Sequence, residues 1–119
     1  MREERGTISQ DVVVYEDYTL WGIIAGKVKV IDGGKLYVRG AVYGDLSVED
    51  GGRAHIFGNI SGNLIVHPGA KVVHSGTLGG DAINKGGRLF IDSFATVMGK
   101  VKALQGTTEV HPKAKVSGS

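Results

Sequence analysis

Histidines and serines are the residues of this 119-residue chain whose side chains could do chemistry. They are His55, His67, His74 and His111, with Ser47, Ser61, Ser75 and Ser93 in or beside apolar segments. A metal site needs several ligands that meet in space, and a nucleophilic serine needs a histidine and a carboxylate beside it. No acidic residue completes a ligand set with these histidines, and no serine has both partners at matching positions. The sequence therefore predicts no catalytic residue, no metal and no cofactor.

The amino-acid composition favours a β fold and excludes some classes of partner. The chain has 20 Gly, 2 Pro and no Cys, and its formal net charge is +2. Glycine and β-branched residues disfavour helices and favour strands with turns. The near-neutral charge predicts no nucleic-acid partner, and membrane association has no support. No apolar leader follows the charged start Met1–Arg5, so we expect a cytoplasmic protein.

A short sequence repeat predicts where the residues named above lie in the fold. Glycines recur every 18 residues in two series, Gly22, Gly40, Gly58 and Gly76 together with Gly26, Gly44, Gly62 and Gly80. Every sixth residue from Ile24 to Leu78 is apolar. At about 3.3 Å per strand residue, six residues make one short strand and a corner. Three such units per 18 residues describe a three-sided coil whose apolar positions face inward.

The predicted fold is therefore all-β, a single-stranded three-sided β-helix (β-solenoid) of about six coils of roughly 18 residues. We expect a short charged tail at 1–7 and one β-helix domain at 8–119. Val12 is expected to align with Val30, 18 residues on. One residue is lost at Gly86–Gly87 and two are gained near Ser93–Phe94. Inward His74 and Asn84 then either bond each other or bond backbone near this irregular coil.

Outward positions on one side predict an interface. Vertical stacking of the coils brings several aromatic side chains into one exposed patch with an arginine and a histidine inside it. The predicted patch consists of Trp21, Tyr37, Arg39, His55, Phe57 and Phe90. Another protein could dock there, or the rings could only stabilise the sheet.

The ends of the stack predict self-assembly. A terminal coil exposes unpaired strand edges and an open core, and the sequence shows no capping helix at either end. The residues expected to take part in end-to-end contacts are Val12, Val14, Leu20, Val110 and Val116.

Two families use a similar repeat. The hexapeptide acyltransferases place a small or acidic residue after each aliphatic position, and only three of the ten positions here fit. The opening Ile8–Val28, the segments Gly44-Asp-Leu-Ser-Val and Gly62-Asn-Leu-Ile-Val, and the corner Pro68-Gly-Ala-Lys-Val resemble the bactofilins. The resemblance spans residues 8 to about 118. It implies a right-handed β-helix, assembly into filaments without nucleotide, and no catalytic residues.

These observations lead to one preferred function and two alternatives. The preferred one is a non-enzymatic structural protein that assembles with itself, end to end, into filaments or an oligomeric scaffold. The first alternative is a discrete protein-binding module, of an inhibitor or immunity type, that uses the aromatic patch. The second is a hexapeptide-type acyltransferase.

Overall fold

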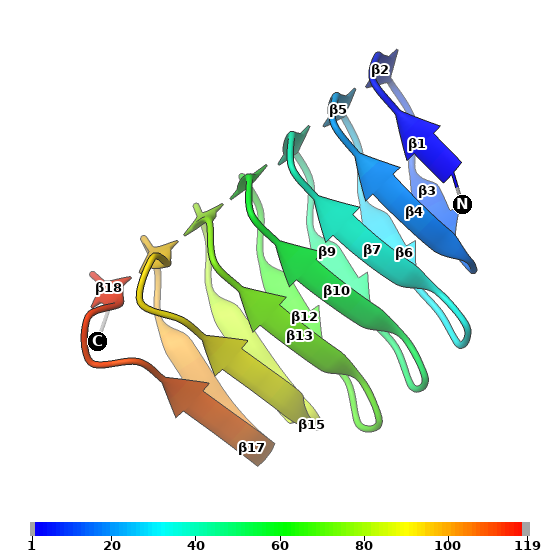
Figure 1. Ribbon diagram of the computed structural model, residues 1–119. Coiled ribbons are helices and arrows are strands. Elements are labelled where there is room, and N and C mark those ends of the chain that lie inside the picture. The colour runs from blue at the N-terminus through cyan, green and yellow to red at the C-terminus, as the bar shows by residue number, and fades with distance from the viewer. Residues whose placement is uncertain (1, 118–119) are drawn as a thin grey trace.

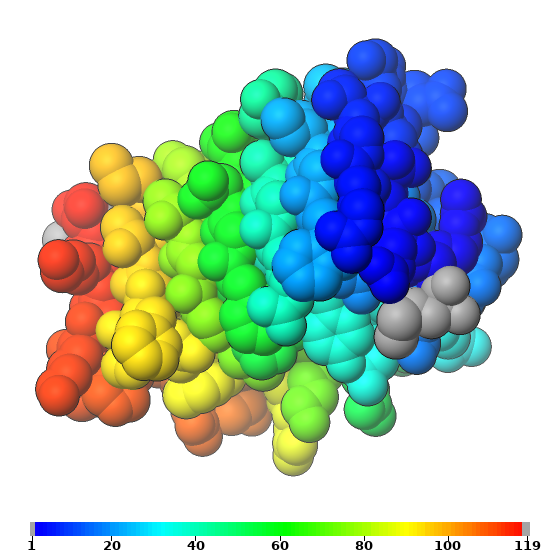
Figure 2. Space-filling view, turned by 45° about the horizontal axis from the view of Figure 1, so that its top comes forward, coloured from blue at the N-terminus to red at the C-terminus, as the bar shows by residue number. Residues whose placement is uncertain are grey.

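The computed structural model describes residues 2–117 and shows an all-β solenoid of about six stacked coils (Figure 1). Every strand pairing among the described residues is parallel, and most coils contribute one short strand to each of three faces. In the last two coils a single ten-residue strand runs across two of the faces. The molecule measures 34 × 24 × 19 Å. The two ends of the chain lie at opposite ends of the stack, and the coils follow one another as bands in sequence order (Figure 2). The predicted fold class is confirmed.

The strands divide among the three faces as follows. Face 1 contains β3 (Val12–Val14), β6 (Val28–Val30), β9 (Leu46–Val48), β12 (Leu64–Val66) and the first parts of β15 (Ala82–Ile91) and β17 (Val101–Val110). Face 2 contains β1 (Arg2–Glu4), β4 (Asp17–Leu20), β7 (Lys35–Val38), β10 (Arg53–Ile56), β13 (Lys71–His74) and the second parts of β15 and β17. Face 3 contains β2 (Thr7–Ile8), β5 (Ile23–Ile24), β8 (Ala41–Val42), β11 (Asn59–Ile60), β14 (Thr77–Leu78), β16 (Thr96–Val97) and β18 (Lys115–Val116).

The core is the inside of the coil stack. The strands of faces 1 and 2 alternate inward and outward side chains, as the period of two for β-strands requires. The inward positions predicted from the six-residue repeat are buried, among them Val30, Val48, Ile56, Ile60 and Leu78. Because each coil covers its neighbours, apolar burial is summed along the stack as in other repeat proteins.

Glycine is required at two kinds of corner. Gly51 has φ +80° at the turn from face 1 to face 2, a conformation that side chains with a Cβ rarely adopt. Gly58, in the turn from face 2 to face 3, lies against the preceding coil, and a Cβ there would overlap the carbonyl oxygen of Gly40. The 18-residue glycine series therefore marks places where coils stack too closely for any side chain.

Side chains also tie the coils together at the corner from face 3 to face 1. A carboxylate oxygen of Asp45 accepts from the backbone N–H of Asn63 at 2.8 Å, and the Asn63 side-chain oxygen accepts from the N–H of Asp81 at 2.8 Å. Asp81 in turn accepts from the N–H of Lys100 at 2.9 Å, and this bond holds the pKa of its carboxyl below the ordinary range. Each coil thus satisfies a backbone donor of the next.

The register changes occur where the sequence predicts them. Val72 pairs with Leu89, one residue short of the 18-residue step, and Leu78 pairs with Val97, one residue beyond it. Ala82 then pairs with Val101. The lost residue at Gly86–Gly87 and the two gained near Ser93–Phe94 are both confirmed.

The first coil differs from the expectation. Arg2–Glu4 forms strand β1 on face 2, so the solenoid includes part of the segment expected to be a tail. Arg2 pairs with Tyr18, sixteen residues on, and Val12 pairs with Val28 instead of Val30. The turn around Tyr15–Asp17 is shorter than its equivalents in later coils, because it lacks the glycine-containing corner that they have.

Candidate functional site

Four of the six predicted patch residues form one cluster on face 2. The Arg39 guanidinium lies between two rings, with its carbon 5.2 Å from the centre of the Trp21 ring and 4.4 Å from that of Phe57. The ring of His55 stacks on Phe57 with 4.0 Å between centroids. Arg5 covers the Trp21 ring at 5.1 Å. We call Trp21, Arg39, His55 and Phe57 the aromatic cluster.

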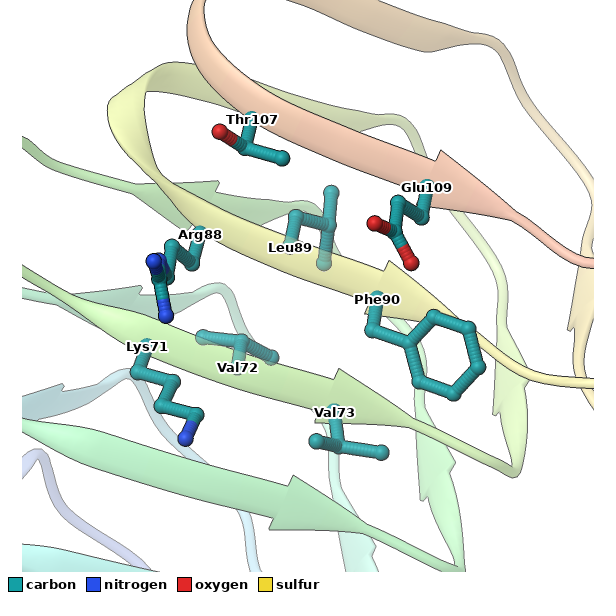
Figure 3. A pocket seen from close by; sticks show the side chains of 8 residues that line it. All are labelled: Lys71, Val72, Val73, Arg88, Leu89, Phe90, Thr107 and Glu109. Atoms are coloured by element: carbon teal, nitrogen blue, oxygen red, sulfur yellow. The ribbon is translucent and has the colours of Figure 1, made fainter.

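Of the other two predicted patch residues, Tyr37 lies beside His55 on the neighbouring coil, and Phe90 lies farther along face 2. Tyr37 is half-buried on β7, and its ring faces the Lys35 ammonium at 5.6 Å. Phe90 lies on β15, where Val73 separates it from His55 in the ladder of outward positions. It lines a pocket with Lys71, Arg88 and Glu109 instead (Figure 3). Val73 therefore interrupts the expected single patch, with Tyr37 and the aromatic cluster on one side of it and Phe90 on the other.

A column of cations runs along the same face, and sequence reasoning missed it. Lys35 pairs with Arg53, Arg53 with Lys71, and Lys71 with Arg88, so four basic side chains stack on four successive coils. We call these four residues the basic column. Each directly follows a corner between faces 1 and 2, which is the sequence signal that could have revealed it. Within residues 2–117, none of the four forms an ion pair.

Two clusters of serine, histidine and carboxylate also escaped the sequence reasoning. On face 1, His67 Nε2 lies 2.9 Å from Ser47 Oγ and 3.0 Å from a Glu49 carboxylate oxygen. The Ser47 hydroxyl bonds the same carboxylate at 3.0 Å. On face 2, Ser75 bonds both His55 Nε2, at 3.3 Å, and the Asp92 carboxylate.

The geometry of these clusters differs from that of a catalytic triad. In a triad the carboxylate holds the histidine nitrogen that does not face the serine. Here both carboxylates bond the serine hydroxyl, and the Glu49 carboxylate lies on the same nitrogen of His67 as Ser47 does. Burial lowers the pKa of His55, with Asp92 opposing that shift and Arg39 adding to it. The clusters act as cross-strand hydrogen bonds between neighbouring coils.

Asn84 is fully buried and organises the irregular coil. Its side-chain oxygen accepts from the N–H groups of Gly86 at 3.1 Å and Gly87 at 2.9 Å. Its nitrogen donates to the carbonyl oxygens of Gly87 and Thr107 and to the Thr108 hydroxyl, at 2.9–3.1 Å. Of the two arrangements that the sequence left open, Asn84 adopts the bonding to backbone.

His74 is also fully buried but poorly satisfied. Its Nε2 donates to the carbonyl oxygen of Thr96 at 3.4 Å, and its Nδ1 has no hydrogen-bond partner. Burial lowers the pKa of His74, with the Thr96 bond and Asp92 opposing the shift. Its neighbours in the same column are Ile56 and Ile91, so the imidazole occupies a place built for an aliphatic side chain.

We expect His74→Ile to stabilise the protein by about 1 kcal/mol at pH 7, because it removes an unpaired buried nitrogen. The gain should grow as the pH falls below 6.5, the ordinary histidine value. There the unfolded wild type binds a proton that folded His74 resists, so wild-type stability declines with acidification. Urea unfolding at pH 7.5 and 5.5 measures both effects. Equal pH dependence of the two proteins would contradict this role for His74.

The residues expected at the ends lie in different environments. Leu20 is fully buried in β4 and covered by β1, so it is not at an end. Val14 is buried at the edge strand β3, and Val12 beside it is half-buried. At the other end Val110 is 43% exposed in β17, and Val116 is half-buried in β18. The Leu20 side chain is therefore not available for the end-to-end contact predicted for it from the sequence.

Comparisons with protein-family models, curated proteins and solved structures found no match. Within residues 2–117, no group of three or more potential ligand side chains could hold a metal ion. The same residues contain no helix long and apolar enough to cross a membrane.

Proposed function

We propose that this chain is a non-enzymatic structural protein that assembles end to end into filaments. The observation that carries the proposal is the outer edge of β17, a ten-residue strand that pairs only with β15 among the described residues. An unpaired strand edge is a template for another strand. In this strand the inward residue Val110 is 43% exposed, and Leu104, at the bulge six residues before it, is 62% exposed.

The opposite end offers a complementary surface. Strand β3 has one partner, β6, and its other edge is unpaired within residues 2–117. Residues 2–17 carry five acids and two arginines, whereas residues 100–117 carry four lysines and one glutamate. The two ends thus have opposite net charge. Arg2 and Glu4 occupy inward positions of β1, and charges there oppose the covering of this strand by any further coil. The edges open to another copy at this end are therefore those of β3 on face 1 and β2 on face 3.

Because the N-terminal and C-terminal ends of the stack carry opposite net charge, the C-terminal end of one copy is attracted to the N-terminal end of another. This contact joins two different surfaces. Such a contact repeats indefinitely unless a rotation closes it into a ring, so it generates filaments. In our proposal β17 and β18 of one copy continue the parallel sheets into β3 and β2 of the next. The bactofilin resemblance supports the same behaviour, without nucleotide and in the cytoplasm.

Val110→Glu tests the proposal. A carboxylate at this inward position should prevent a second copy from covering the terminal coil, because burying it unpaired is strongly unfavourable. We expect the variant to remain monomeric at concentrations where the wild type assembles. Gln105→Glu is the matched control, since it adds the same charge to the exposed corner of β17. Sedimentation velocity distinguishes the species, and identical behaviour of Val110→Glu and wild type would contradict the proposal.

The aromatic cluster supports a second candidate, a discrete protein-binding module. Trp21 and Phe57 are 44% and 39% exposed although the two arginines partly cover their rings. Aromatic and arginine side chains are the residues most enriched at binding hot spots. This function becomes the preferred one if the wild type is a monomer under all conditions.

A further inference from the structure

The basic column places like charges side by side. Acids lie at its two ends, where Asp17 pairs with Lys35 and Glu109 lines a pocket with Lys71 and Arg88, but no acid lies between neighbouring cations of the column. Directly opposed like charges on neighbouring strands destabilise a sheet, yet Lys35, Arg53, Lys71 and Arg88 repeat this arrangement three times. The Lys35 ammonium also faces the Tyr37 ring at 5.6 Å. Such an array is suited to an anion that runs along the stack.

The surroundings of the column define the shape of that anion. Neighbouring coils lie about 4.8 Å apart, so the four cations form a straight line of roughly 14 Å. On one side runs a shallow groove along the corner, lined by Gly51, Gly52, Gly69, Gly86 and Gly87, which lack side chains that would keep a ligand away. On the other side lie pockets lined by Tyr37 and His55 and by Val73 and Phe90 (Figure 3).

We propose that this strip on face 2 binds single-stranded nucleic acid. The phosphates follow the basic column, and bases stack on two rings beside it, those of Tyr37 and Phe90. Single-stranded nucleic acids are bound by this combination of a positive track and aromatic platforms. The expectation of no nucleic-acid partner rests on net charge, which does not reveal this column because acids at its ends and elsewhere in the chain offset its charge.

The surface fits a linear polyanion better than a lipid bilayer. Binding to a membrane interface uses apolar side chains that protrude beside the cations. Here Phe90 beside the column is only 37% exposed, and Tyr37 is half-buried. The most exposed aromatic side chain, Phe94 at 83%, lies in the turn after face 2, beyond the end of β15. This inference does not depend on end-to-end assembly.

The test is fluorescence anisotropy with a labelled oligo-dT of about 12 nucleotides, at salt concentrations from about 20 to 200 mM. Four phosphate contacts predict that log K falls against log salt with a slope of about −3, since each contact to a single strand contributes about −0.7. Arg53→Gln with Lys71→Gln should halve this slope and weaken binding at least tenfold at low salt. Lys27→Gln with Lys29→Gln, an equal loss of charge on exposed residues before and within β6, should change it little.

A second pair of variants separates stacking from charge. Tyr37→Leu and Phe90→Leu should weaken oligo-dT binding severalfold and leave the salt slope unchanged, because stacking releases no counterions.

Three results would overturn the proposal. They are no oligo-dT binding at 20 mM salt, an equal loss in the Lys27 and Lys29 control, and binding only to vesicles of phosphatidylcholine and phosphatidylglycerol.

Discussion

Val30→Asp should abolish cooperative folding. Val30 is fully buried on face 1, between Val14 and Val48 of the neighbouring coils. An aspartate there loses the apolar contacts of valine and places a carboxylate in a core without a cation or a donor. The expected cost is about 4 kcal/mol or more, which approaches the whole stability of a typical domain. We expect insoluble protein, or a thermal melt without a cooperative transition.

Lys29→Asp is the matched control for this change. Lys29 precedes Val30 in β6, but its side chain is exposed. The same aspartate there should alter stability by no more than about 1 kcal/mol. Comparable melting curves for Lys29→Asp and Val30→Asp would show that the inward and outward positions are assigned incorrectly.

Asn84→Leu should be nearly as damaging, although it makes the core more apolar. It removes five hydrogen bonds and leaves the N–H groups of Gly86 and Gly87 without acceptors at a buried corner. Each unsatisfied buried group costs about 1–3 kcal/mol. We expect a loss of about 3–5 kcal/mol, largest in the last coil, because Asn84 also bonds Thr107 and Thr108 of β17.

Urea unfolding and amide hydrogen exchange measure this effect. Exchange should accelerate most across residues 101–117, since solenoid coils depend on their nearest neighbours. His74→Ile serves as the comparison, because it is also a polar-to-apolar change in the core but should stabilise. A stabilised Asn84→Leu protein would mean that its polar network contributes nothing to the fold.

Because the sequence repeats, most features of the solenoid could be predicted from it. An 18-residue period fixes which residues stack, and the inward residues, the glycine corners and both register changes followed from it. The first coil was mispredicted because its step is sixteen residues, which moved Val12 from Val30 to Val28. Arg2 and Glu4 were read as part of a tail because charged residues at inward positions break the apolar pattern.

The functional surfaces were harder to predict. The pairs Ser47–His67 and His55–Ser75 are twenty residues apart, diagonal neighbours that an exact 18-residue comparison overlooks. The basic column keeps the repeat, but it mixes Lys with Arg and shifts by one residue at Arg88. The bonds of Asn84 depend on a β-bulge, which sequence position alone does not describe.

Sedimentation velocity of the wild type over a range of concentrations at low salt, with negative-stain microscopy of the same samples, tests the central claim of end-to-end assembly most directly. We expect particles that lengthen with concentration in steps of about the 34 Å long axis, while the cross-section stays near 24 × 19 Å. High salt should shorten them, because oppositely charged ends attract less strongly when screened. A single 12.5 kDa species at every concentration and salt would contradict the account.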